Sequence, residues 1–285
     1  MVGNIMNIFK QYPVSTYFVL TFAISWGGFI LALGGPAGFA NTDVWQDASF
    51  GFAVAAMLAG PSVAGLLMTS LIDGKAGLGR LFSILIKWRV GIRWYAISIL
   101  TAPILSMIAL FSLSISSPIF TVDNKFSILL PGIIAGLSTV FEEIGWTGFA
   151  INKLRQRYSI LATGLIVGSL WGAWHFLASL WGSSGSSGGI SLALYLPVML
   201  FSFLPPYRVL MVLVYDRTGS LLVAMLMHLS LTASVRILDP LAISGAPILI
   251  YNLVLAAALW IVVAIVAIAK RGNYGQDCQS VRCFN

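Results

Sequence analysis

The chain has 285 residues, of which 59% are hydrophobic and 9% are charged, and its formal net charge is +7. Soluble domains usually carry roughly a quarter charged residues, so this composition excludes an ordinary soluble fold. Apolar stretches of about twenty residues, each long enough to cross a bilayer, recur along the whole length. We therefore expect an all-α polytopic membrane bundle, with residues 1–285 as one membrane domain. The basic residues form no stripe with interleaved aromatics, so no nucleic-acid partner is expected.

Hydropathy predicts about eight membrane-spanning helices and a polar tail over residues 272–285. The predicted spans cover residues 14–33, 50–72, 94–116, 127–151, 159–181, 190–215, 219–237 and 246–269. An even number of spans puts both termini on one side of the membrane. The positive-inside rule assigns that side to the cytoplasm, because nearly all basic residues then fall inside. We expect a bacterial cell membrane and leave the oligomeric state open.

Small residues at four-residue spacing mark two of the predicted spans. The fourth span contains Gly132 and Gly136, and the fifth contains Gly164, Gly168 and Gly172. Such small-xxx-small seams let two helix backbones approach closely in a membrane. We therefore predict that the fourth and fifth spans pack against each other, and that Glu143, near the seam of the fourth span, faces the fifth.

The few ionisable groups that the spans retain are the strongest functional signal. The only two glutamates, Glu142 and Glu143, are adjacent in the fourth span, and the only two histidines, His175 and His228, lie in the fifth and seventh. An ionisable side chain at membrane depth costs several kcal/mol unless it is paired or hydrated. We therefore interpret these four residues as one functional site. Thr232 lies one helical turn beyond His228 on the same helix face.

The residues around these groups resemble three motifs of the CAAX-prenyl-protease and bacteriocin-processing (CPBP) family. The segment Phe141–Phe149 resembles Glu-Glu-x-x-x-Arg, Trp171-x-x-x-His175 resembles Phe-x-x-x-His, and His228-x-x-x-Thr232 resembles His-x-x-x-Asn. The resemblance covers residues 125–240, which we take as the catalytic core. It implies an intramembrane endopeptidase that cleaves a membrane-associated or lipidated peptide or protein. The process would be CAAX-type processing, or bacteriocin maturation or self-immunity.

The resemblance also implies a role for each residue of the site. Glu142 would be the general base with His175 as its partner in activating a water, and Glu143 would support Glu142. His228 and Thr232 would donate hydrogen bonds to the oxyanion. The alternative within the same chemistry is a zinc ion held by Glu142, His175 and His228. We expect no cofactor, because the sequence has no His-Glu-x-x-His pair.

Two positions depart from the family motifs. Thr147 stands where the first motif has arginine, and Thr232 stands where the third has asparagine. A threonine hydroxyl still donates one hydrogen bond, but the first exchange removes a positive charge. We predict that Arg208, which follows a Pro-Pro pair about 10 Å inside the sixth span, supplies this charge by pairing with Glu143. The alternative is that Arg208 snorkels to the lipid headgroups.

A non-enzymatic membrane protein is the alternative from another class of function. The Glu/His cluster could relay protons in a transporter, or the chain could be a scaffold that confers immunity to a bacteriocin. The sequence shows no inverted repeat of the kind found in many transporters, so we favour the peptidase. Its partners would be membrane lipid and the peptide substrate, and Trp174 would wall the substrate cavity.

Overall fold

The computed structural model describes residues 7, 9–35, 48–120, 126–182, 187–238 and 244–281. Within these ranges the chain is helical and forms no strand. Eight segments are long and apolar enough to cross a membrane: Pro13–Ala32, Ser49–Leu85, Ile92–Ser114, Ser127–Leu154, Ile160–Trp181, Leu192–Thr218, Leu221–Leu238 and Ala246–Ala269. Each of the eight predicted spans corresponds to one of these segments. The all-α polytopic bundle is thus confirmed.

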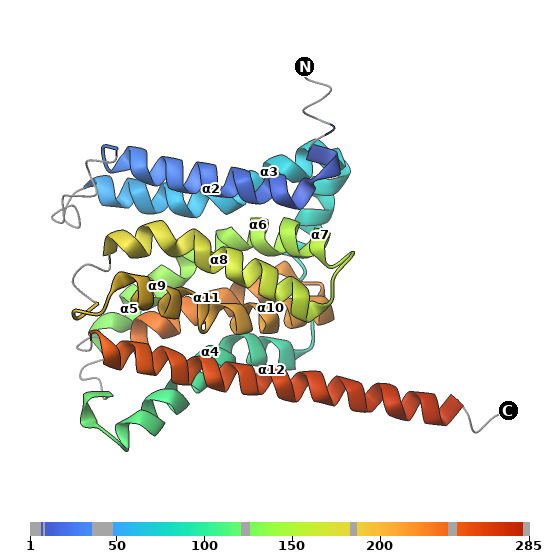
Figure 1. Ribbon diagram of the computed structural model, residues 1–285. Helices are drawn as coiled ribbons and strands as arrows, with labels where there is room; N and C mark the ends of the chain where they lie inside the picture. Colours follow the sequence, from blue (N-terminus) through green and yellow to red (C-terminus); the bar gives the residue numbers. More distant parts are fainter. Residues whose placement is uncertain are drawn as a thin grey trace.

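Two pairs of helices form the outer layers of the bundle (Figure 1). One layer consists of α2 (Pro13–Ala32) and α3 (Ala48–Leu85), and the other contains α4 (Ile92–Ser114) and α12 (Ala246–Val281). α2 begins and α12 ends on the same side of the bundle, as an even number of crossings requires. Residues 282–285 of the predicted polar tail lie outside the described residues.

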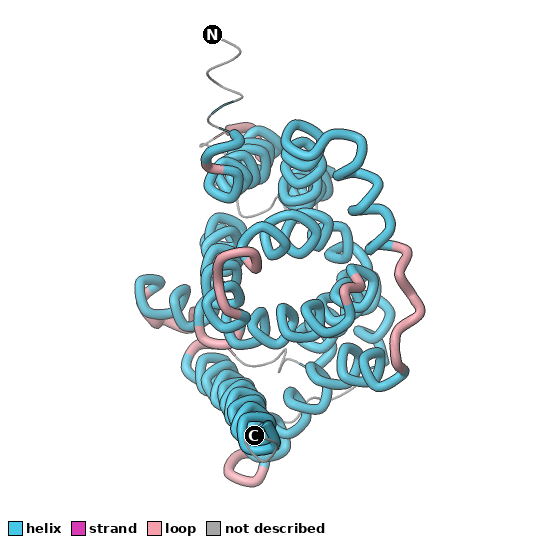
Figure 2. Tube along the Cα trace, turned by 90° about the vertical axis from the view of Figure 1, so that its right-hand side faces the viewer, coloured by secondary structure: helices cyan, strands magenta, loops and turns pink. Residues whose placement is uncertain are grey.

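The middle of the bundle holds the helices that carry most of the candidate site. These are α5 (Phe126–Thr139), α8 (Ile160–Gly182), α9 (Leu192–Phe201), α10 (Leu204–Thr218) and α11 (Leu221–Leu238). Figure 2, which looks roughly along the helix axes, shows the helices of this middle group between the two outer layers. α10 packs against α8 and α11, so side chains from these three helices can meet at one depth.

The fourth span is not one regular helix. α5 is followed by a 3₁₀ turn at Val140–Glu142, by α6 (Glu143–Gly145), by a π-helical segment at Trp146–Ile151 and by α7 (Asn152–Leu154). π-Helical turns are rare and occur frequently at functional sites. The helix winding therefore changes at the place where the two glutamates lie.

The prediction that the fourth and fifth spans pack through their glycine seams is wrong. A Cβ atom on Gly136 would lie 2.7 Å from the carbonyl oxygen of Leu229, so α5 packs on α11. A Cβ atom on Gly168 would lie 2.6 Å from Cα of Pro205, so α8 packs on α10. Both seams do mark close helix contacts, but the spacing of small residues does not identify the partner helix.

The sixth span breaks into α9 and α10 just before Pro205 and Pro206. Proline has no backbone N–H and fits best in the first turn of a helix, so two consecutive prolines favour a new helix start at this point. Arg208 follows one residue after Tyr207 in the second turn of α10, and both side chains are fully buried. The helix that begins at this break therefore carries a cation in the middle of the bundle.

α3 crosses the fourth span at Gly145. A Cβ atom at this position would overlap the carbonyl oxygen of Pro61 and lie 2.5 Å from the hydroxyl oxygen of Tyr17. In addition, the hydroxyl of Ser62 donates a hydrogen bond to the carbonyl of Phe141 at 2.6 Å. Only glycine allows this approach, which fixes α3 to the segment that carries the glutamates.

We predict that Gly145→Ala destabilises the protein by at least the roughly 1–3 kcal/mol typical of overpacking, because the added methyl group meets backbone atoms of Pro61. Gly27→Ala in α2 is the control, since a Cβ atom there has open space and alanine favours a helix. Thermal unfolding of both variants in one detergent is the measurement. Equal melting temperatures would contradict the close crossing at Gly145.

We also predict that the segment 75–93, with five basic residues, faces the cytoplasm. In a variant that lacks Cys278 and Cys283, Ala76→Cys, at an exposed position, should react with an impermeant maleimide only after the cells are opened. Ser116→Cys, also exposed and beyond the other end of α4, should react in intact cells. The opposite labelling pattern would reverse the orientation in the membrane.

Candidate active site

The candidate site brings together side chains from four spans. The glutamates come from the fourth span, His175 from α8, Arg208 from α10 and His228 from α11. Glu142 and His228 are 1% exposed, Glu143 and Arg208 are fully buried, and His175 is partly buried. These groups are far apart in the sequence, so the site exists only when the bundle is assembled.

Glu143 is the centre of a buried hydrogen-bond network. Nη1 of Arg208 lies 2.8 Å from Oε1 and 2.9 Å from Oε2 of Glu143. Nδ1 of His228 lies 2.8 Å from Oε1, and the hydroxyl of Thr147 donates to Oε2. Glu143 therefore connects the fourth, sixth and seventh spans. The prediction that it faces the fifth span is wrong, because both of its long-range partners lie on α10 and α11.

Arg208 forms the predicted ion pair with Glu143 and does not snorkel. Its side chain is 0% exposed, so it cannot reach the headgroups. The guanidinium carbon lies 4.1 Å from the centre of the Trp171 ring, in a cation–π contact. The other guanidinium nitrogens, Nε and Nη2, have no hydrogen-bond partner among the described residues. The charge of Arg208 is thus shared between one carboxylate and one aromatic face.

Glu142 has a separate set of contacts. The indole N–H of Trp146 donates to Oε2 of Glu142 at 3.1 Å. The Trp146 ring packs edge-to-face on Trp174 with centroids 5.8 Å apart, and Trp174 packs edge-to-face on His175 at 4.7 Å. A chain of aromatic contacts therefore leads from Glu142 to His175. No hydrogen bond joins the two directly in the part of the chain that the structure describes.

Trp171 lies between the two histidines. Its ring packs edge-to-face on His175, with centroids 5.5 Å apart, and on His228, at 4.9 Å. Its backbone carbonyl also lies 2.8 Å from Nδ1 of His175. The sequence predicts neither a role of its own for Trp171 nor these contacts. The available signal was its position as the aromatic residue of the second motif.

Thr232 lies at the edge of the site. Its hydroxyl oxygen is 3.4 Å from that of Thr139 on α5, at the long limit of a hydrogen bond. It lies one helical turn from His228 on α11, as expected from the spacing. Its hydroxyl is therefore only weakly engaged by the protein.

The alternative of a zinc ion held by Glu142, His175 and His228 does not fit the arrangement of these side chains. Over the described ranges, no three His, Cys, Asp or Glu side chains form a group that could hold a metal ion. The contacts of the two histidines at Nδ1, with Glu143 and with the carbonyl of Trp171, leave each Nε2 available, so the placement of the side chains alone disfavours zinc. We therefore derive no step through a metal.

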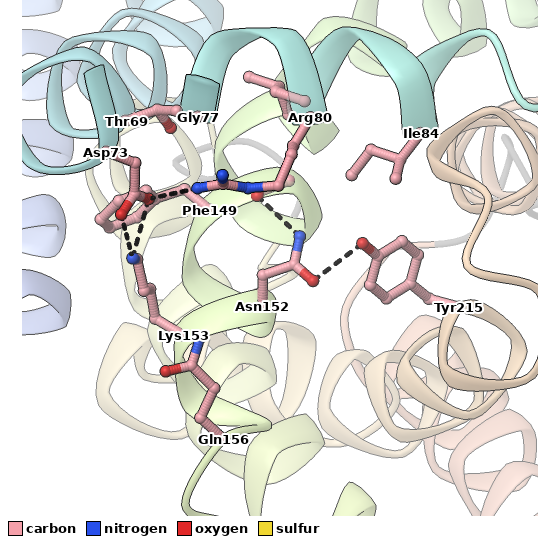
Figure 3. A pocket seen from close by; sticks show the side chains of 12 residues that line it. Thr69, Asp73, Gly77, Arg80, Ile84, Phe149, Asn152, Lys153, Gln156 and Tyr215 are labelled. Carbon is pink, nitrogen blue, oxygen red and sulfur yellow. Dashed lines mark hydrogen bonds and ion pairs between the residues drawn. The ribbon is translucent and has the colours of Figure 1, made fainter. Parts of the chain in front are cut away.

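A polar pocket of about 350 Å³ lies next to this network along the fourth span (Figure 3). Lys153 binds both carboxylate oxygens of Asp73, at 3.1 and 2.9 Å, and the hydroxyl of Tyr215 donates to Asn152 at 2.9 Å. Gly148, the residue after Thr147, also lines the pocket. None of the predicted catalytic residues does, so the pocket is a neighbour of the site and not the site itself.

Comparisons with known proteins identify the segment that carries these residues. Residues 121–234 match the family of Rce1-like type II CAAX prenyl endopeptidases. A stretch of 40 residues is 42% identical to CAAX prenyl protease 2 of Methanococcus maripaludis, and this alignment covers 14% of the chain and 15% of that protein. The resemblance to the CPBP family is thereby confirmed, and its match contains both glutamates, both histidines and Thr232.

We predict that Arg208→Leu and Glu143→Gln each cost roughly 3–5 kcal/mol of stability, because each leaves the partner buried without its counter-charge. The double variant should lose clearly less than the sum, because the two residues interact directly. Unfolding in detergent is the measurement for all three variants. Simple additivity would contradict the ion pair.

The control is the ion pair between Arg155 and Asp216, which has a similar distance of 2.7 Å but partly exposed side chains. Arg155→Leu and Asp216→Asn should each change the stability by about 1 kcal/mol or less, because water screens an exposed pair. The contrast between the two cycles isolates the effect of burial.

Proposed function

We propose that this protein is an intramembrane endopeptidase that hydrolyses a peptide bond in a membrane-associated or lipidated peptide or protein. The observation that carries the proposal is the buried cluster of two glutamates, two histidines and Arg208, within a segment of the CAAX endopeptidase family. Such groups are expensive inside a membrane, so a functional site is the default interpretation. CAAX-type processing, bacteriocin maturation and self-immunity are the candidate processes, with both termini in the cytoplasm of a bacterial cell.

Glu142 is the better general base of the two glutamates. Glu143 already accepts hydrogen bonds from Arg208, His228 and Thr147, so its lone pairs are occupied. Glu142 accepts one from Trp146 at Oε2, and its Oε1 receives none from the residues described in the structure. A general base needs a free lone pair within reach of the water. This contrast supports the order that the family resemblance implies.

The proposed reaction is the direct attack of water on the peptide carbonyl. Glu142 takes a proton from the water as the water oxygen bonds to the carbonyl carbon, and the carbonyl π electrons move onto its oxygen. When the C–N bond breaks, the proton passes to the leaving nitrogen, so the products are a carboxylic acid and an amine. His175 would help to hold the water, and Thr232 would donate a hydrogen bond to the oxyanion.

We predict that Glu142→Gln and His175→Ala abolish cleavage while the protein still folds, because both residues would contact the attacking water. The assay is mass spectrometry of lipidated peptides incubated with purified protein in lipid vesicles. Asp216→Asn is the matched control, since it removes a carboxylate that is bound to Arg155 outside the site, and it should cleave at the parental rate. Parental activity of Glu142→Gln would refute the glutamate-base mechanism.

The same assay distinguishes the zinc alternative. Activity that survives prolonged incubation with a strong chelator supports the metal-free mechanism. Loss of cleavage on chelation, with recovery when zinc is added back, would require a metal and a rearrangement of Glu142, His175 and His228 toward one another.

A further inference from the structure

Both histidines present Nδ1 to an oxygen atom that carries no proton to donate. For His175 this oxygen is the backbone carbonyl of Trp171, at 2.8 Å. For His228 it is Oε1 of Glu143, also at 2.8 Å. A carbonyl oxygen or an ionised carboxylate can only accept a hydrogen bond, so the ring nitrogen must be the donor. The proton of each ring therefore lies on Nδ1.

The argument for His228 requires that Glu143 is ionised, and the contacts of its carboxylate support this state. Arg208 is always protonated in proteins, and its Nη1 lies within 2.9 Å of both oxygens. The hydroxyl of Thr147 donates to Oε2, and Nδ1 of His228 approaches Oε1. Three donors thus converge on two oxygens, and a proton on Glu143 would face a donor instead of an acceptor.

The charge of Glu143 is already balanced by Arg208, so a second cation on buried His228 would lack a counter-charge of its own, which favours a neutral ring. A neutral imidazole carries one N–H, so a proton fixed on Nδ1 leaves a lone pair on Nε2. We infer that Arg208 is a positioning residue that acts through Glu143 to fix the proton of His228 on Nδ1, and so makes Nε2 a hydrogen-bond acceptor in the resting protein. Thr147 assists by holding the second oxygen of the same carboxylate.

For the reaction, which rests on the proposed peptidase function, this state changes the role of His228. A bare Nε2 would repel an oxyanion, so His228 is not a preformed oxyanion donor as the resemblance implies. Instead, Nε2 of His228 and Nε2 of His175 are both acceptors, and they share the O–H of the attacking water that Glu142 does not take. The groups left to donate to the oxyanion are the hydroxyl of Thr232 and the indole N–H groups of Trp171 and Trp174, which lack acceptors among the described residues.

The chain has two histidines, so nitrogen NMR of protein labelled with ¹⁵N-histidine reports on both rings without overlap from others. The experiment uses the full chain in lipid nanodiscs at neutral pH and needs no substrate. In the parental protein both rings should carry the proton on Nδ1 and a bare Nε2. His175→Ala leaves one ring and assigns the signals. A protonated Nε2 on His228 in the parental protein would overturn the inference.

Arg208→Leu tests the positioning role directly. Without the cation, the buried Glu143–His228 pair either holds a proton on the carboxyl group, which then donates to Nδ1, or becomes an ion pair with imidazolium. Both states place a proton on Nε2 of His228, so its signal should change while that of His175 stays the same. An unchanged His228 signal would show that Arg208 does not position the proton.

Two further variants complete the test. Arg208→Lys retains the positive charge and should restore the parental signal of His228, which a loss of packing alone would not predict. Arg236→Leu removes an exposed cation from the same helix as His228 and should leave both signals unchanged. If Arg208→Leu does not fold, the spectra of the parental protein and of Arg208→Lys still test the inference. A protonated Nε2 on His228 in either spectrum rejects it.

The result is separable from the proposed function. Cleavage of peptides by a protein whose His228 carries a proton on Nε2 would reject the positioning role of Arg208 and leave the peptidase intact. The expected spectra from a protein that cleaves no peptide would uphold the positioning role and reject the peptidase.

Discussion

The buried ion pair between Glu143 and Arg208, together with His228, joins three of the four spans that form the site. Removing two charges from water is costly, and the cost is offset only when the geometry is good and the remaining polar atoms are satisfied. Here one guanidinium nitrogen binds both carboxylate oxygens, and a threonine and a histidine complete the contacts of the carboxylate. The Trp171 ring covers the cation, whose Nε and Nη2 have no hydrogen-bond partner among the described residues. The fourth, sixth and seventh spans are thereby held in a single register relative to one another.

Because of this pair, the two adjacent glutamates have different hydrogen-bond contacts. Glu143 makes four hydrogen-bond contacts with its neighbours. Glu142 makes one, with the indole of Trp146, and its Oε1 accepts none from the described residues. Adjacent residues on a helix point about 100° apart, so one can face the packed interior while its neighbour faces the substrate side. A carboxylate held by four contacts beside one held by a single contact is a direct consequence of this geometry.

The sequence predicts much of this arrangement, and its failures have physical reasons. The number of spans and the pairing of Arg208 with Glu143 follow from hydropathy and from the cost of an unpaired charge in a membrane. The helices that pack on Gly136 and Gly168 cannot be predicted in this way, because small residues allow a close approach but do not determine which helix approaches. The contacts of Trp171 with Arg208 and both histidines were likewise unpredictable, because they depend on how three spans converge.

The π-helical segment Trp146–Ile151 has a further consequence for how this span can vary. It accommodates more residues per turn than an α-helix, so it sets the angular phase between the glutamates above it and the Asn152–Leu154 turn below it. A π turn holds about one residue more than an α turn, so loss of one residue from this segment with a return to α-helical winding would leave the glutamates and Asn152 in nearly the same angular relation. The same loss from a regular α-helical stretch would rotate one end against the other by about 100°. A one-residue deletion should therefore disturb the site less within this segment than within the regular helices of the other spans.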